Sequence, residues 1–193
     1  SQFQFNETHQ WFSISLGSMG QFMSKYTLGV DGLSISLLLL TGLITWVALW
    51  NSTDIKEKIS GYYALVLLLN ASIMGCFMTK DLFLFYVFFE FMLLPMYFLI
   101  GIWGGPRRNY ASLKFFIYTL LGSLFILIVM LGMGVAYVDP YETALLNGLI
   151  RPEQGFNVEA LKAVQQMIQS QELASSTFVH SFDMQALADV NNC

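Results

Sequence analysis

Long apolar runs limit the folds open to this sequence more than any other feature does. The run at residues 82–103 contains one charged residue, Glu90, and comparable runs cover residues 28–50, 61–79 and 111–138. A helix that crosses a membrane needs about 20 predominantly apolar residues. The sequence therefore predicts an all-α, polytopic helical membrane protein with four transmembrane helices at these positions.

The composition agrees with a membrane location and argues against several other classes of protein. Charged residues make up 11% of the chain, whereas soluble domains carry about 25%. The net charge is -4 and no basic stripe is present, so nucleic acid is not an expected partner. The two cysteines, Cys76 and Cys193, give neither a disulfide framework nor a zinc motif. The lipid bilayer and other membrane subunits are the expected partners.

Basic residues predict which way the helices run through the membrane. Four of the nine lie in the loops 51–60 and 104–110, which two helices separate and which therefore share one side of the membrane. Cytoplasmic loops are enriched in Lys and Arg, so we expect both loops in the cytoplasm. The basic residues of the two loops are Lys56, Lys58, Arg107 and Arg108.

Two segments are expected outside the membrane, on the periplasmic side. Residues 1–27 form an N-terminal arm that is polar and aromatic and lacks the basic start and apolar core of a secretory signal. Residues 139–193 are acidic and form a long loop. Within this loop, apolar residues recur at helical spacing and predict a short amphipathic helix that packs on neighbouring protein. These residues are Val158, Leu161, Val164 and Ile168.

Three polar residues are assigned structural roles by their positions. Asp31 and Asp81 each precede an apolar run, where a carboxylate can accept hydrogen bonds from the first backbone N–H groups of a helix. Asn70 lies near the centre of the second run and is expected to form a hydrogen bond to another helix.

Glu90 is the residue whose position calls most strongly for a chemical explanation. It lies near the midpoint of its run, where an ionised side chain costs about 3 kcal/mol or more. Desolvation favours the neutral acid unless a cation offsets it. A carboxyl group balanced between the two states can take up and release protons inside a membrane. The alternative is that Glu90 pairs with a buried cation and only fixes helix packing.

The same helical face carries further polar groups. At 100° per residue, Tyr86, Tyr97 and Gly101 point within about 40° of the direction of Glu90. Gly101 would allow a neighbouring helix to approach closely. Pro95 leaves the carbonyl of Phe91 without its helical hydrogen bond. Tyr86 and Tyr97 are candidate members of a proton relay, or else core aromatics with a satisfied hydroxyl.

Lys114 is the second candidate ion, about one turn inside the fourth run. It is either a lysine that extends to the membrane interface or the cationic partner of a protonatable acid. No metal or cofactor is expected on this chain, because His9 and His180 lie outside the runs and could not clamp a haem within the bilayer. Walker, dinucleotide-binding and zinc motifs are also absent from the sequence.

Three stretches together resemble one family of membrane proteins. They are "LGVDGLS", "DLFLFYVFFEFMLLPMYFLIGIWGG" and "YASLKFFIYTLLGSLFILI". They are similar to the M subunit (NuoM-type) of the proton-translocating NADH:quinone oxidoreductase of bacteria, the counterpart of chain 4 of mitochondrial complex I. The resemblance covers residues 28–136, and residues 81–105 are its most specific part.

The resemblance implies an antiporter-like subunit of about fourteen helices arranged as two inverted repeats with broken helices. Glu90 matches the family's glutamate on the fifth helix. The family's lysine on the next, broken helix has no counterpart here, so we expect this chain to be part of a longer subunit. NADH, flavin, iron–sulfur clusters and quinone would be bound by other subunits. The expected location is the bacterial inner membrane.

Several functions remain open at this point. The leading hypothesis is a membrane subunit that moves protons, driven by redox chemistry in other subunits. A related subunit of a multisubunit cation/proton antiporter or a membrane-bound hydrogenase would use the same parts. A structural membrane subunit that transports nothing is the alternative of another class. A subunit that itself binds quinone or haem is disfavoured by the missing histidines.

Overall fold

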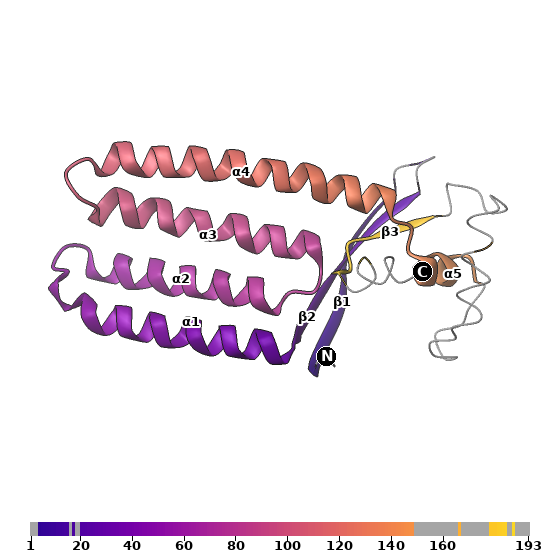
Figure 1. Ribbon diagram of the computed structural model, residues 1–193, viewed down its shortest axis with the longest axis horizontal. Coiled ribbons are helices and arrows are strands. Elements are labelled where there is room, and N and C mark those ends of the chain that lie inside the picture. The colour runs from indigo at the N-terminus through magenta and orange to yellow at the C-terminus, as the bar shows by residue number, and fades with distance from the viewer. Residues whose placement is uncertain are drawn as a thin grey trace. The chain divides into compact units, whose positions relative to one another are not determined.

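Four long helices dominate the computed structural model (Figure 1), which describes residues 4–15, 17, 20–148, 166, 178–184 and 187. Each of the four is long and apolar enough to cross a membrane. The predicted helical membrane fold is thereby confirmed. The helices are α1 Gly32–Asn51, α2 Ile59–Met78, α3 Leu82–Trp103 and α4 Arg108–Ala136.

Three of these helices begin elsewhere than the sequence predicted, and of these α2 begins at Ile59 instead of residue 61. The predicted start of the first helix at residue 28 is wrong, because residues 28–30 finish a strand, β2 Gln21–Val30. Asp31 then caps α1, and its Oδ1 accepts a hydrogen bond from the Ser34 backbone N at 2.7 Å. That hydrogen bond holds the pKa of the Asp31 carboxyl below its usual value. The fourth helix begins at Arg108, so the basic loop before it is shorter than predicted.

A tight turn joins α2 to α3 and is fastened to the end of β2. The Asp81 carboxylate accepts hydrogen bonds from the backbone N of Phe83 at 2.9 Å and of Leu84 at 3.0 Å, which confirms the predicted cap. The Lys80 backbone N donates to the Thr27 carbonyl at 3.0 Å. The turn that starts α3 is therefore bonded to the chain that leads into α1.

The helices differ in how much of their surface other helices cover. Within the helix group, α3 lies between α2 and α4, and α1 lies beyond α2 (Figure 1). Leu84, Leu93 and Pro95 of α3 are buried, whereas α1, which the structure describes throughout, has no buried residue. In a bilayer the outward apolar side chains of α1 and α4 would meet lipid or other membrane subunits.

Helix α1 is joined to α2 by the hydrogen bond expected of Asn70. The Thr45 hydroxyl donates to Asn70 Oδ1 at 2.9 Å. Both residues are partly buried, and hydrogen bonds of this kind between polar side chains help membrane helices associate. This prediction is confirmed.

A small sheet was not predicted from the sequence. Strands β1 Gln4–Ser15, β2 and β3 Val179–Ser181 form it in the order β1-β2-β3. Strand β3 runs parallel to β2, with Gln21 opposite Val179 and Met23 opposite Ser181. Strand β3 has only three residues, Val-His-Ser, which is too short to show the alternating pattern of a strand.

Helix α5 Pro140–Leu146 lies beside β3 and is bonded to it. Asp139 caps α5, and its Oδ2 accepts a hydrogen bond from the Ser181 hydroxyl at 2.8 Å. The Val179 backbone N donates to the Thr143 hydroxyl at 3.1 Å. The amphipathic helix predicted around residues 158–168 lies outside the described residues.

Candidate functional site

Glu90 lies near the middle of α3, among side chains that are almost all apolar. The helix forms there because an uninterrupted apolar run follows the Asp81 cap, and Pro95 is accommodated in its interior. The Oε1 atom of Glu90 is buried and has no hydrogen-bond partner among the residues that the structure describes. A buried polar atom left unpaired in this way calls for a functional or solvent-based explanation.

Tyr86 is the titratable side chain that the structure brings to Glu90. It lies one helical turn earlier on α3, and its hydroxyl interacts with the Glu90 carboxyl and with the hydroxyl of Ser123 on α4. The three groups therefore form a small polar cluster between the two helices. Sequence reasoning had found Tyr86 and Glu90 but not Ser123.

Tyr97 makes ring contacts instead. Its ring centroid lies 5.4 Å from that of Phe98 and 5.5 Å from that of Phe116 on α4. Such contacts are typical of a core aromatic. The contact with Phe116 joins α3 to α4 at a point nearer the C-terminal end of α3 than Glu90. A relay role for Tyr97 stays a prediction.

A stripe of hydroxyl residues on α4 faces α3. Ser112 and Ser123 are 3% and 2% exposed, and Thr119 is half-buried between them. Each hydroxyl donates its proton to a carbonyl of its own helix: Ser112 to Asn109, Thr119 to Phe115 and Ser123 to Leu120, at 2.7–3.1 Å. The lone pairs of these oxygens remain as hydrogen-bond acceptors. The helical spacing of 112, 119 and 123 was the sequence signal that could have revealed the stripe.

Two glycines mark how closely the neighbours approach α3. A β-carbon placed on Gly75 of α2 would lie 2.5 Å from the Phe88 ring, which no real structure tolerates without movement. A β-carbon on Gly101 would lie 3.5 Å from the Ser112 hydroxyl, an ordinary contact distance. The close approach of α2 to α3 therefore requires glycine at position 75 of α2. The approach of α4 to α3 depends less on glycine at position 101.

Lys114 lies on an exposed part of α4. Its Nζ lies 5.7 Å from the ring centroids of Tyr110 and of Tyr118, one turn away on either side. Aromatic faces attract a cation at this range. The described ion pairs place Lys25 with Glu142 and give Lys114 no acidic partner within the described residues.

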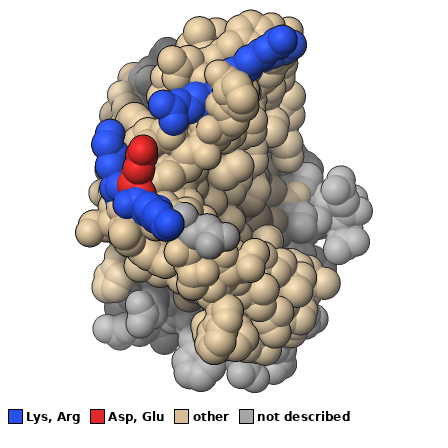
Figure 2. Space-filling view, turned by 90° about the vertical axis from the view of Figure 1, so that its left-hand side faces the viewer, with Lys and Arg blue, Asp and Glu red and all other residues tan. Residues whose placement is uncertain are grey.

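Four exposed basic residues lie at one end of the helix group. The loops before α2 and before α4 both lie there (Figure 1), and Figure 2 shows basic side chains gathered on that end beside an acidic one. The exposed residues concerned are Lys56, Glu57, Lys58, Arg107 and Arg108.

Side chains hold these two loops to α3. The Trp103 indole N donates to the Glu57 carbonyl at 2.9 Å, and the Arg108 guanidinium donates to the Ile102 carbonyl at 2.6 Å. The C-terminal end of α3 is thus fixed to both loops.

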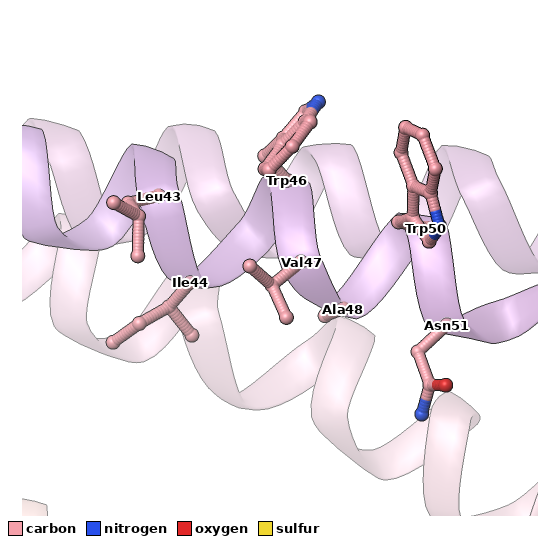
Figure 3. A pocket seen from close by; sticks show the side chains of 7 residues that line it. All are labelled: Leu43, Ile44, Trp46, Val47, Ala48, Trp50 and Asn51. Atoms are coloured by element: carbon pink, nitrogen blue, oxygen red, sulfur yellow. The ribbon is translucent and has the colours of Figure 1, made fainter.

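An open groove of about 590 Å³ runs along α1 (Figure 3). Its lining contains no titratable side chain, and it lies on a different helix from Glu90. Apolar side chains and tryptophans suit contact with acyl chains better than catalysis. The lining residues are Leu43, Ile44, Trp46, Val47, Ala48, Trp50 and Asn51.

The residues that the structure describes contain no group of three or more His, Cys, Asp or Glu side chains able to hold a metal ion. His9 lies in β1 and His180 in β3. The His180 ring stacks on Phe22 at 4.9 Å, and its Nδ1 lies 2.8 Å from the Tyr137 carbonyl. This histidine is packed as a structural residue.

Residues 79–139 match a family model described as the transmembrane part of NADH:quinone oxidoreductase and Mrp antiporters. NAD(P)H-quinone oxidoreductase chain 4 2 of Thermosynechococcus vestitus is 44% identical over 134 residues, which cover 69% of this chain and 24% of that protein. The chloroplastic chain 4 of Chara vulgaris is 44% identical over 128 residues, covering 66% and 24%. Chain 4 1 of Synechococcus elongatus is 46% identical over 113 residues, covering 58% and 21%.

The chain spans about a quarter of the length of these curated relatives. The matched range contains the whole of α3, with Tyr86 and Glu90, and the whole of α4, with Ser112 and Ser123. The similarity therefore centres on the two helices that form the polar cluster. Residues 79–139 are thus similar to the transmembrane part of the NADH:quinone oxidoreductase and Mrp antiporter family.

Proposed function

We propose that this chain is part of a proton-translocating membrane subunit of an NAD(P)H:quinone oxidoreductase, and that Glu90 is its protonatable centre. The observation that carries the proposal is the Glu90 Oε1 atom, which is buried at the middle of a membrane-spanning helix without a described hydrogen-bond partner. The relatives named as NAD(P)H-quinone oxidoreductase chain 4 support the choice of complex.

The hydroxyls of α4 are suited to hydrogen-bond a neutral acid on α3. They present acceptors toward α3 because their protons are bonded to their own helix. A cation brought near the site would favour the carboxylate and release the proton. The family resemblance implies a lysine on a following broken helix for this purpose, and such an approach would act as a switch.

Redox chemistry would take place in other subunits. In this proposal NADH, flavin, iron–sulfur clusters and quinone are bound there, and neighbouring antiporter-like subunits and lipid surround the present chain. Tyr86 would assist proton exchange at Glu90, while Tyr97 and Lys114 are held as lesser candidates. The basic end, with Lys58 and Arg107, would face the cytoplasm of a bacterial cell, because cytoplasmic loops are enriched in Lys and Arg.

Replacement of Glu90 by Gln in the full-length subunit tests the proposal. Gln keeps the size and most of the hydrogen bonding but cannot exchange a proton. We expect an assembled complex that still passes electrons from NADH to artificial acceptors but has largely lost quinone-linked activity and proton pumping. Glu90→Asp should keep part of both, because the carboxyl group survives about one methylene away.

The measurements are quinone reductase activity and the proton gradient in membrane vesicles. Wild-type values of both in Glu90→Gln would assign Glu90 a packing role and contradict the proposal. That outcome would leave the structural, non-transporting subunit as the remaining function.

A second candidate is a subunit of an Mrp-type cation/proton antiporter, since the matching family model includes that class. Both candidates use Glu90 in the same way. Purification of the tagged full-length protein separates them, because an NADH-oxidising activity should copurify in one case and be missing in the other.

A further inference from the structure

Ser123 lies level with Glu90 on the facing helix. The Gly101–Ser112 contact fixes how α3 and α4 lie alongside each other. Eleven residues separate Gly101 from Glu90 along α3, and eleven separate Ser112 from Ser123 along α4. At 1.5 Å per residue, each is about 16 Å from that contact. Eleven residues are also close to three full helical turns, so each pair shares one face of its helix.

The environment of Ser123 agrees with this register. Its side chain is 2% exposed, and the Tyr86 hydroxyl interacts with both Ser123 and the Glu90 carboxyl. The Tyr97–Phe116 ring contact, at 5.5 Å, supports the same alignment of the two helices. Ser123 is thus a buried hydroxyl directed at the polar cluster.

The hydrogen bond of Ser123 decides which of its groups faces α3. Its Oγ donates to the Leu120 carbonyl at 2.9 Å, so its lone pairs are the groups offered to α3. A lone pair can accept the proton of a neutral carboxylic acid but cannot stabilise a carboxylate. Rotation of the hydroxyl about its C–O bond or of the side chain about χ1 would turn the donor toward α3, and the Leu120 carbonyl would keep its helical hydrogen bond.

We propose that Ser123 is a positioning residue for Glu90, accepting a hydrogen bond from the neutral acid and donating one to the carboxylate. Ser123 keeps its own proton in both states and only changes the direction of its hydroxyl. This inference rests on the proposed function of Glu90 and adds the group that accommodates its change of charge. It assigns the α4 stripe a role that sequence patterning alone did not indicate.

Other charged and titratable groups are few around this cluster. On α3 the group concerned is Tyr86, and α2 carries no Asp, Glu, Lys or Arg, its buried side being small residues such as Ser72. Cys76 of α2 is a thiol in that helix. On α4, Lys114 is exposed and lies over tyrosine rings. On the facing helix, Ser123 is therefore the buried polar group level with Glu90 that can respond to its charge, in addition to Tyr86 on α3 itself.

The test measures protonation of Glu90 directly in membranes that hold the assembled, full-length complex. A hydrophobic carbodiimide reacts with protonated carboxyl groups, so the labelled fraction of the peptide containing Glu90, measured by mass spectrometry over a pH series, reports the neutral acid. Ser123→Ala removes both the acceptor for the neutral acid and the donor to the carboxylate. Because a hydrogen bond to the charged form is the stronger of the two, we expect the pH of half-maximal labelling to rise by about one unit.

Matched variants separate positioning from packing. Ser112 lies on the same face of α4 as Ser123, and its hydroxyl likewise donates to the carbonyl three residues earlier. Ser112→Ala should therefore leave the labelling curve unchanged. Ser123→Thr retains the hydroxyl and should restore a wild-type curve. Ser123→Cys, which keeps the size with a weaker donor, should give an intermediate shift and serves if the alanine variant does not assemble.

An unchanged labelling curve in Ser123→Ala or Ser123→Cys would overturn the proposal, and so would an equal shift in Ser112→Ala. Neither result depends on pumping. If Glu90→Gln pumps normally while Ser123→Ala shifts the labelling curve, the proposed function fails and the Ser123–Glu90 link stands. If Glu90→Gln abolishes pumping while the curve is unmoved, the reverse holds.

Discussion

The two sides of α3 contact different kinds of residues. Toward α2, Gly75 lets the Phe88 ring lie against the helix backbone, at a distance where a methyl group would collide. Toward α4, the contacts are the Tyr97–Phe116 ring pair and the hydroxyls of Ser112 and Ser123. Helix α2 approaches α3 closely because Gly75 has no side chain. Helix α4 contacts α3 through polar and aromatic side chains.

The difference shows where a membrane helix can carry an acid. Without a hydrophobic driving force between helices in lipid, close packing of small residues is a main source of association. A side that is packed in this way has no room for a change in hydrogen bonding. The α4 side has hydroxyls that can turn, and the Tyr86 hydroxyl interacts there with Ser123 as well as with Glu90. In the proposed function, helix association and proton exchange therefore use opposite sides of one helix.

The largest effect in this comparison is expected on the α2 side. Gly75→Val places branched carbon atoms into the Phe88 ring and should cost about 3 kcal/mol or more, above the 1–3 kcal/mol typical of overpacking. We expect loss of assembled complex on native gels. The double variant Gly75→Val with Phe88→Ala provides the control, because removing the ring should recover part of the assembly. Normal assembly of Gly75→Val would show that this side is not closely packed in the membrane.

The turn between α2 and α3 gives the next largest effect. Asp81→Ala leaves two buried backbone N–H groups without their acceptor and should cost about 0.5–2 kcal/mol. A fall in the temperature at which the detergent-purified complex loses this subunit measures it. Asp81→Asn, which keeps an oxygen acceptor, should lose less. An equal loss in both variants would mean that the negative charge, and not the cap, is what matters.

The hydrogen bond between α1 and α2 is a smaller test of the same side. Thr45→Val removes the donor to Asn70 and should cost about 0.6 kcal/mol, the average for such bonds in membrane proteins. The paired variant Thr45→Val with Asn70→Leu should cost less than the separate changes combined, because no polar group is left alone. Strict additivity in thermal unfolding would contradict a direct bond.

Lys114 is expected to matter little for pumping. Its Nζ lies over two tyrosine rings, and such contacts contribute about 0.5–1 kcal/mol at exposed sites. Lys114→Arg should be harmless, and Lys114→Ala should lower thermal stability slightly. Pumping in vesicles is the decisive measurement, since a clear loss in an assembled Lys114→Ala complex would make this lysine a partner of an acid.

The smallest effect is predicted at Gly101. A β-carbon there would meet the Ser112 hydroxyl at an ordinary distance, so Gly101→Ala should leave assembly and activity within experimental error of the wild type. Gly75→Ala, compared in the same assay, should be clearly destabilising. Equal behaviour of the two alanine variants would remove the distinction between the two sides of α3.

Most of the helices could be predicted from the sequence because the residues that define each helix lie within it or just before it. A run of about 20 apolar residues spans a bilayer, and a carboxylate just before such a run caps it, as Asp31 and Asp81 do. The start of α1 was predicted too early because residues 28–30 are apolar enough for either a helix or a strand. Their pairing in β2 is decided by partners elsewhere in the chain.

The sheet and the placement of Ser123 near Glu90 each depend on how two segments pair, so neither could be predicted from one segment alone. Strand β3 pairs with β2 across more than 150 residues, as the register of Val179 with Gln21 shows. Such pairing leaves no periodic signal within three residues. Ser123 has helical spacing with Ser112, but its relation to Glu90 depends on the register between two helices. Glu90 was found because a charge in an apolar run is unusual by itself.

The attachment of α3 at both ends limits how this helix could move in the proposed transport. At one end, the turn before α3 is bonded to β2 through Lys80 and Thr27. At the other, Trp103 donates to the Glu57 carbonyl in the loop before α2. A helix fastened at both ends resists sliding and rotation as a unit. We therefore expect the helix bearing Glu90 to act as a fixed reference, with the working displacements made by rotating hydroxyls and by approaching helices. Crosslinks between α3 and either attachment should then leave turnover intact.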